Sequence, residues 1–321
     1  MATIADRNQS RRALERLLER AAGPDDAFEL AFRGPIDLAR NFVCPTSTPL
    51  FYAPVYRQLS ESARLRYNQL TAVSFNELIA FFETTFALSV LSALASGTLH
   101  RDAPEFARGL TQFVAEEQKH TEWWRELSRL SAAERAQPVF RVPSATRLLL
   151  KQVTRRPKAF PVVFWIMLAL EERSIDISRR CLRIDPADIE PNYREVYRRH
   201  LEHEVGHVYL DCQLIERYYA GRSRVVRSVN ARLLRTAVAA FLLPPVRSAA
   251  RVVKQLIHEF PELLPLRNTI LQQLRTVGSQ ADYHAMMYSR RTTPITFTML
   301  DRFPEMHAMS RVLQCYIPQP A

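Results

Sequence analysis

Apolar residues recur every three or four positions in four long segments of the chain, at residues 60–97, 102–130, 161–183 and 186–219. That spacing places the apolar side chains on one face of an α-helix. The first segment contains no proline or glycine before its last residue, and the fourth ends near Gly221. Asp102, with Glu105 three residues later, is typical of a helix start. Four long helices in succession predict an antiparallel all-α bundle.

The regions on either side of these segments are more interrupted. Within residues 1–55, an amphipathic stretch at 13–22 is followed by four prolines, which predicts a short helix and then an irregular arm. A short helix is expected at 144–154, and 293–298 is weakly strand-like. We expect a single domain made of an N-terminal arm at 1–55 packed on the core, the bundle at 56–221 and C-terminal helices at 222–321.

The composition supports a helical, packed protein. Glycine is scarce, with 7 residues among 321, which argues against β-barrels, turn-rich sandwiches and glycine-rich nucleotide folds. Hydrophobic residues make up 47% and charged residues 24%, so a buried core is expected. Neither GxGxxG nor GxxxxGK[ST] occurs, so any electrons that the protein uses must come from a partner.

The charge balance is basic, with a formal net charge of +11 carried almost entirely by arginine. Five arginines open the segment that follows Gly221, at positions 222, 224, 227, 232 and 235. Such a cluster could dock an acidic electron donor or an acidic carrier protein, or could form a solvated face. The arginines are not interleaved with aromatic residues, so we do not expect a nucleic-acid partner.

Three features indicate a cytoplasmic protein without a membrane span. The four cysteines are far apart and form no CxxC pair, which fits a reducing compartment. The N-terminal residues lack the apolar core of a signal peptide. The longest apolar run, at 160–170, has 11 residues, whereas a membrane-spanning helix needs about 20.

The strongest chemical signal is a Glu-x-x-His pair that occurs twice, at Glu117 with His120 and at Glu204 with His207. Residues three apart in a helix share a face, so each pair can bind one metal ion. The two pairs fall on the second and fourth predicted helices. A dinuclear carboxylate site also requires a glutamate from each of the other two helices.

On the first helix, Glu83 is a better candidate than Glu77. Residues equidistant from the turn of an antiparallel hairpin lie at the same height. The midpoint between Glu83 and Glu117 is position 100, inside the expected turn at 97–102. The midpoint between Glu77 and Glu117 is position 97, at the edge of that turn, so Glu77 fits slightly less well. Glu83 also lies on an apolar stripe, where a carboxylate is costly unless it is paired or bound to a metal.

On the third helix, Glu171 and Glu172 are both candidates. The midpoint between Glu172 and Glu204 is position 188, within the expected connection at 185–191. Glu171 fits this spacing equally well. Helical periodicity places Glu171 on the more apolar stripe. The choice between them therefore stays open on spacing alone.

The fourth helix carries a third histidine on the same face. His200 precedes Glu204 by four residues and His207 by seven, so all three side chains point one way. The resulting set has three histidines and four carboxylates. Asp211, one turn beyond His207, either orients a ligand or is exposed.

This set resembles the p-aminobenzoate N-oxygenase family of ferritin-like diiron enzymes over residues 60–220. The matching pieces are Asn76-Glu77-x5-Glu83, Glu117-x2-His120 and His200-x3-Glu204-x2-His207. The third histidine separates that family from ferritins and ribonucleotide-reductase-like proteins. The family pattern after the helix-3 glutamate fits Glu172 better than Glu171, opposite to periodicity. The family usually has an acidic residue before Glu204, where this chain has His203.

The resemblance implies a ferritin-like bundle that binds two iron ions, uses O2 as co-substrate and takes electrons from an external reductase or ferredoxin. It implies oxidation of an amine to hydroxylamine, nitroso or nitro products, and we expect a homodimer. Apolar residues near the predicted site suit an aromatic or aliphatic small molecule. The metal ligands would be drawn from Glu83, Glu117, His120, Glu171, Glu172, His200, Glu204 and His207.

Three other interpretations are compatible with parts of the pattern. The ligands alone do not distinguish N-oxygenation from C-hydroxylation or desaturation by the same class of enzyme. His203, Glu204 and His207 also read as the HExxH motif of zinc hydrolases, but that interpretation leaves His120 and His200 without a role. A non-catalytic metal-binding bundle is the third possibility.

Overall fold

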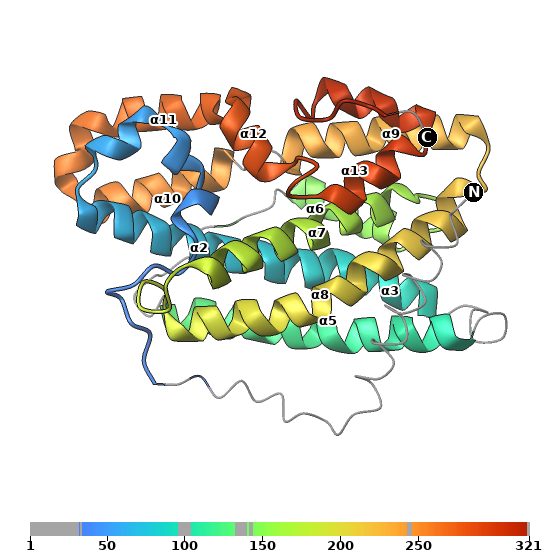
Figure 1. The fold of residues 1–321 in the computed structure, drawn as a ribbon, viewed down its shortest axis with the longest axis horizontal. Coiled ribbons are helices and arrows are strands. Elements are labelled where there is room, and N and C mark those ends of the chain that lie inside the picture. The colour runs from blue at the N-terminus through green and yellow to red at the C-terminus, as the bar shows by residue number, and fades with distance from the viewer. Residues whose placement is uncertain are drawn as a thin grey trace.

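Four long helices form the centre of the computed structural model, which describes residues 32, 34–95, 104–131, 140, 144–242 and 246–319 (Figure 1). The first, α2 (Glu61–Phe82), continues through a π-helical segment, η4 (Glu83–Ala87), into α3 (Leu88–Ala95). The others are α5 (Pro104–Ser131), α7 (Val162–Arg183) and α8 (Pro191–Ile215). The expected all-α fold is confirmed: the described residues contain no strand, only an isolated bridge between Asn41 and Ile189.

Local sequence signals start two of these helices. The Ser60 hydroxyl accepts a hydrogen bond from the Ala63 amide at 3.2 Å and caps α2. The Glu190 carboxylate accepts one from the Tyr193 amide at 2.8 Å and caps α8, which has proline at its first position. The expected cap at Asp102 lies outside the described residues.

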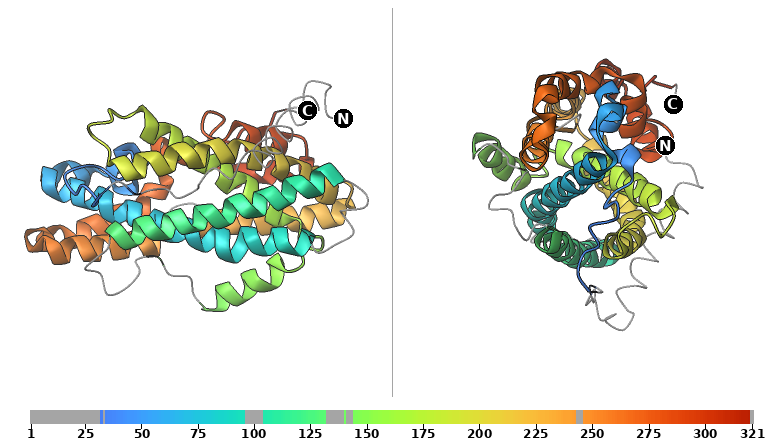
Figure 2. Two further views of the ribbon diagram at one scale, coloured as in Figure 1. Left: turned by 90° about the horizontal axis from the view of Figure 1, so that it is seen from below. Right: turned by 90° about the vertical axis from the view of Figure 1, so that its left-hand side faces the viewer.

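The long helices pair as two hairpins, α2 with α5 and α7 with α8, and α5 also packs on α8. Seen end-on, the helices run side by side (Figure 2). Phe113, Phe164 and Leu168 are fully buried between them. This packing turns the apolar stripes of the four helices toward one another, and the polar residues on those stripes are buried with them.

The C-terminal helices form a second layer over one side of the bundle (Figures 1 and 2). The helix α9 packs on α7, and α10 packs on α2. The short helix α6 (Ser144–Thr154) has the predicted bounds and packs beside η4. The C-terminal layer contains α9 (Arg224–Ala237), α10 (Val246–Glu259), α11 (Arg267–Thr276), α12 (Ala281–Met287) and α13 (Pro294–Asp301), with the π-helix η6 (Val238–Leu242) and the 3-10 helix η9 (Pro304–Arg311).

Two expectations for the flanking regions were wrong. The weakly strand-like stretch at 293–298 is helical, because Pro294 at the first position of α13 fixes a helical φ and Glu172 caps the helix. The arm after residue 44 is not irregular: each of three prolines starts a short 3-10 helix, at Pro45–Ser47, Pro49–Tyr52 and Pro54–Gln58. The helix expected at 13–22 lies outside the described residues.

One continuous helix, from Glu61 to Ala95, is long and apolar enough to cross a membrane, with a mean hydropathy of 1.8 in its most apolar window. The same helix packs on α5 and α10 and carries the buried Glu83. The core helix of a globular protein can be equally long and apolar. The packing of this helix on α5 and α10 is typical of such a core helix.

Candidate metal centre

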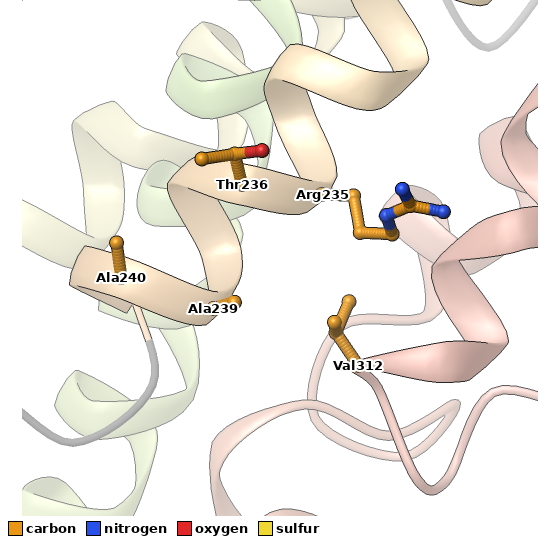
Figure 3. Close-up of a pocket in the computed structure, with 5 residues that line it drawn as sticks. All are labelled: Arg235, Thr236, Ala239, Ala240 and Val312. Atoms are coloured by element: carbon orange, nitrogen blue, oxygen red, sulfur yellow. The ribbon is translucent and has the colours of Figure 1, made fainter.

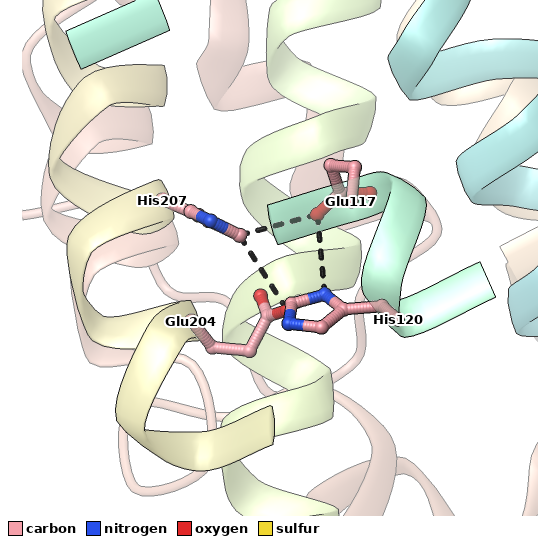
Figure 4. A group of neighbouring side chains, drawn as sticks. All are labelled: Glu117, His120, Glu204 and His207. Carbon is pink, nitrogen blue, oxygen red and sulfur yellow. Dashed lines mark ion pairs between the residues drawn. The ribbon is translucent and has the colours of Figure 1, made fainter. Parts of the chain in front are cut away.

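Glutamate and histidine side chains from α5 and α8 converge in the centre of the bundle (Figure 4). Glu117, His120, Glu204 and His207 each offer one ligand atom, and all four atoms lie within 4.8 Å of one another. Glu117 Oε1 is 3.5 Å from His120 Nδ1 and 3.2 Å from His207 Nδ1. All four side chains are fully buried. The two Glu-x-x-His pairs predicted from the sequence therefore meet at one place.

A second group, formed by Glu83, His120 and His200, adjoins the first and shares His120 with it. Glu83 Oε1 lies 3.9 Å from His120 Nδ1 and 3.7 Å from His200 Nε2. Thr121 donates a hydrogen bond to the other oxygen, Glu83 Oε2, at 3.1 Å. Glu83 is the first residue of the π-helical segment η4, and such segments recur at functional sites because the extra residue redirects side chains.

Glu204 stands at the centre of the three histidines. Its Oε1 atom lies 3.0 Å from His200 Nε2 and 3.4 Å from His120 Nδ1. The same oxygen is 3.6 Å from His207 Nδ1. One carboxylate oxygen thus faces three imidazole nitrogens, an arrangement suited to a carboxylate that is shared between two metal ions.

The atoms that face the centre have no hydrogen-bond partner among the described residues, although they are buried. A buried polar atom without a partner is costly and calls for a ligand, an ion or water. These atoms are Glu117 Oε1 and Oε2, His120 Nδ1, Glu171 Oε1, His200 Nε2, Glu204 Oε1 and Oε2, and His207 Nδ1. Carboxylate oxygens and imidazole nitrogens in this proportion suit iron, manganese or zinc. The residues therefore fit a dinuclear metal centre.

Each histidine is held by a hydrogen bond on the ring nitrogen that points away from the centre. His207 Nε2 lies 2.8 Å from Glu116 Oε2, and Gln112 donates to the other oxygen of Glu116 at 2.9 Å. His200 Nδ1 lies 3.0 Å from the Ser174 hydroxyl. A partner on the distal nitrogen fixes ring orientation and tautomer, as is usual for metal-binding histidines.

The third histidine, His120, has another histidine as its partner. His120 Nε2 lies 2.8 Å from His203 Nδ1, and the two rings are stacked with their centroids 5.1 Å apart. His203 is buried but belongs to neither group of converging ligand atoms. The HExxH interpretation, in which His203 and His207 bind zinc together, is therefore not supported by the geometry.

Sequence spacing did not single out Glu116 and Ser174, although a signal for both was present. Glu116 precedes His120 by one helical turn, and Ser174 follows Glu171 by three residues, so each lies on the side of its helix that faces the centre. What could not be read from the sequence is that each one reaches a histidine on α8.

On the third helix, the two candidate glutamates point to different places. Glu171 is buried with an unpartnered Oε1. Burial raises its pKa, and the nearby charges of Glu204 and Glu117 raise it further. Glu172 points instead to α13, where its two oxygens accept hydrogen bonds from the Ile295 and Thr296 amides, each at 2.7 Å. Both oxygens of Glu172 are thus engaged at a helix N-terminus, while Glu171 faces the cluster.

Glu77 lies away from the centre. Its Oε2 atom accepts a hydrogen bond from the Phe140 amide at 2.7 Å. Asp211 is fully buried, and both of its oxygens lack a hydrogen-bond partner among the described residues. The exposed alternative considered for Asp211 is therefore wrong, although no direct bond to His207 is present.

The electrostatics show that the cluster has more negative charge than its histidines balance. Burial, with the charge of Glu117 and Glu204, raises the pKa of Glu83 to about 8. Burial works against the charged form of His200, but Glu204 and Glu83 outweigh it and raise the pKa of His200 to about 9. In the same way Glu204 and Glu116 raise the pKa of His207. Bound divalent cations would replace these protons and leave the imidazoles neutral.

The geometry predicts different outcomes for two adjacent substitutions. Glu171→Gln is expected to lower metal binding strongly, because it removes a charge that faces the centre. Glu172→Gln is expected to keep the metal but to lower the free energy of unfolding by about 1–2 kcal/mol, since it weakens the cap on α13. Metal analysis and urea unfolding of both variants test this. If Glu172→Gln lost the metal and Glu171→Gln kept it, the metal ligand on α7 would have been assigned to the wrong glutamate.

A comparison with known protein families connects this centre with a class of enzymes. No curated protein matches the chain significantly. Residues 7–262 match one protein family, the p-aminobenzoate N-oxygenase AurF family. The matched residues include the whole Glu/His cluster. The match covers most of the chain and agrees with the resemblance seen in the sequence. The chain therefore belongs to the p-aminobenzoate N-oxygenase AurF family of oxygenases.

Proposed function

We propose that this protein is a non-haem diiron oxygenase that N-oxygenates an amine. The observation that carries the proposal is the convergence of buried carboxylate and imidazole groups from η4, α5 and α8 in two adjoining groups of ligand atoms that share His120. On α7, a buried and unpartnered oxygen of Glu171 completes the set. We assign the ligands as Glu83, Glu117, His120, Glu171, His200, Glu204 and His207. When bound, two reduced iron ions would activate O2 and supply electrons for its reduction.

The chain's own residues fix the protonation of the ligands. A carboxylate can only accept, so a hydrogen bond between Glu116 and His207 places the proton on Nε2 and leaves the Nδ1 lone pair for a metal. For His120, a free Nδ1 lone pair requires the proton on Nε2, which then donates to His203 Nδ1. These partners present neutral imidazoles in one orientation.

Aromatic and aliphatic side chains exclude water from the centre. The Phe113 ring stacks on His207 with centroids 3.9 Å apart, and Trp124 meets His200 edge-on at 5.1 Å. Leu168 is fully buried in the same core. A dry, apolar surround strengthens electrostatic interactions in the site and suits an aromatic or aliphatic amine. The same proposal includes an external electron donor, a homodimer and a cytoplasmic location.

Product analysis tests the reaction. The protein is loaded anaerobically with Fe(II), and we expect about two iron ions per chain, as the seven-ligand set requires. Exposure to O2 with p-aminobenzoate and a panel of other aromatic amines should then give hydroxylamine, nitroso or nitro products. Metal-free protein is the control. Products hydroxylated at carbon would favour the C-hydroxylase alternative, and zinc binding without O2 consumption would contradict the proposal.

A further inference from the structure

The basic charge of the chain is concentrated in one segment. From Arg217 to His258 the sequence contains nine arginine or lysine residues and no aspartate or glutamate. Most of the formal net charge of +11 therefore comes from this stretch, which includes α9 and α10. Arg227 is neutralised by Glu305, 2.9 Å away on η9, whereas Arg222, Arg224 and Arg232 are exposed. A surface with an excess of positive charge attracts a partner of opposite charge and increases its rate of association.

Helix α9 presents an apolar stripe on its outward face. Val225 is 73% exposed, Val229 is 49% exposed and Leu233 is 42% exposed. These residues are four apart and so lie in one row along the helix. On the opposite face, Ala231 and Leu234 are buried in the core. Helix α9 is thus anchored to the bundle on one side and exposes large apolar side chains on the other.

Arginines border this stripe. Arg224 and Arg232 are exposed, and neither forms an ion pair with a described residue. At the far end of α9, a hollow of about 350 Å³ is lined by side chains of α9, η6 and the C-terminal segment (Figure 3). Its lining consists of Arg235, Thr236, Ala239, Ala240 and Val312. An apolar centre with a cationic border is typical of a surface that binds an acidic protein.

We propose that this α9 face, comprising Arg224, Val225, Val229, Arg232 and Leu233 with the adjoining hollow, docks a small acidic redox protein that reduces the metal centre. The inference rests on the diiron function proposed above. In each reduction step the partner loses one electron and one iron goes from Fe(III) to Fe(II), so two one-electron steps reduce the pair. No covalent bond forms or breaks.

The position of α9 favours an electron donor over other acidic partners. The Asn230 side chain on α9 accepts a hydrogen bond from the Val162 amide at 2.9 Å, at the start of α7. Glu171 follows nine residues later, about 14 Å along the helix. Helix α7 therefore runs from the inner side of α9, beneath the docking face, toward the metal centre.

A chain of aromatic groups follows the same route. The Tyr219 hydroxyl donates a hydrogen bond to the Arg227 carbonyl of α9 at 3.3 Å. The Tyr219 ring meets Trp165 on α7 edge-on, with centroids 5.3 Å apart. Trp165 is buried, six residues before Glu171. Trp165 and Glu171 lie on the same helix, so this series of contacts leads from α9 along α7 toward the metal centre.

The experiment uses a reduced, acidic [2Fe–2S] ferredoxin as the probe. Arg224→Glu with Arg232→Glu reverses the charge of the face, and Val229→Ser removes an apolar contact. Arg267→Glu with Arg275→Glu makes the same charge change on the exposed side of α11 and serves as the control. Calorimetry measures ferredoxin binding to the metal-free and iron-loaded chain at several salt concentrations. Stopped-flow absorbance measures reduction of the ferric centre by ferredoxin and, separately, by dithionite.

We expect the Arg224 and Arg232 double variant to weaken ferredoxin binding and slow reduction by about tenfold or more, with a smaller dependence on salt. Val229→Ser should weaken binding with the salt dependence unchanged. Reduction by dithionite and binding by the α11 control should stay as in the wild type. A centre that dithionite cannot reduce, or that holds no iron pair, would argue against the diiron function itself.

Three results would overturn the docking face while leaving the diiron function intact. The first is that ferredoxin does not bind, or that it binds the charge-reversed variant with the same affinity as the wild type. The second is that the α11 control weakens binding equally, which would show only a general charge effect. The third is that Val229→Ser converts a dimer into monomers in analytical ultracentrifugation, which would identify the face as an interface between two copies of the chain.

Discussion

Glu204→Ala is expected to abolish iron binding at both positions of the centre. Glu204 Oε1 faces all three histidines at 3.0–3.6 Å, whereas Glu83 and Glu117 each face two of them. Removal of Glu204 eliminates a shared negative charge and leaves the imidazoles without a common partner. Iron per chain after anaerobic loading should fall at least about tenfold, since metal binding to a buried site depends on its charge.

The neighbouring Glu202→Ala is the matched control for this substitution. Glu202 lies on the same helix, is exposed and pairs with Arg198 on the surface. Exposed pairs of this kind contribute little to stability, so iron binding and the melting temperature should be unchanged. Glu204→Gln keeps the shape of the side chain and separates loss of charge from loss of packing.

Thermal unfolding provides a second measurement of the same effect. Binding to the native state alone stabilises it, by about 2.7 kcal/mol when free metal exceeds its dissociation constant a hundredfold. Fe(II) should therefore raise the melting temperature of the wild type and of Glu202→Ala, but not that of Glu204→Ala. A metal-dependent rise in all three proteins would show that Glu204 is not a ligand.

The fold could be predicted from sequence where local pattern and long-range packing agree. The helix at 144–154 was located to the residue. The spacing of the first hairpin placed Glu83 level with Glu117, and in the structure Glu83 lies 3.9 Å from His120, one turn after Glu117 on α5. The reason is that long amphipathic helices joined by short connections have few alternative arrangements. The π-helical segment that starts at Glu83 was not predicted, because one extra residue in a turn hardly changes the apolar periodicity.

The choice between Glu171 and Glu172 required the tertiary structure. The two side chains differ by about 100° around α7, and both faces are covered in the folded protein. Two backbone amides of α13 donate hydrogen bonds to Glu172. The position of α13 depends on how the last third of the chain packs. Periodicity along α7 alone favoured Glu171, and its unpartnered buried oxygen agrees with that preference.

His200→Ala and His203→Ala are expected to have opposite effects, although the two residues are less than one turn apart on α8. His200 directs Nε2 toward Glu204 at 3.0 Å and Glu83 at 3.7 Å. That nitrogen is buried and has no hydrogen-bond partner among the described residues, so the substitution removes a ligand atom. Iron content and O2-dependent activity should both be lost.

His203 acts on the metal only through His120. In His203→Ala the His120 ring loses the hydrogen bond that fixes its orientation, but its Nδ1 atom stays available. Loss of such a partner typically lowers metal affinity about 10–100-fold without preventing saturation. The variant should therefore bind two iron ions at high metal concentration, with a weaker dissociation constant. A titration with Fe(II), followed by absorbance, distinguishes a weakened site from an absent one.

The same pair of variants decides between the diiron centre and an HExxH zinc site. In a zinc hydrolase, His203 and His207 would hold the metal, Glu204 would be the general base and His200 would be incidental. His203→Ala would then empty the site, and His200→Ala would leave it full. We expect the reverse, because the unpartnered nitrogen of His200 faces the carboxylates while the Nδ1 atom of His203 is bonded to His120. An empty site in His203→Ala together with full metal occupancy in His200→Ala would refute the diiron assignment of α8.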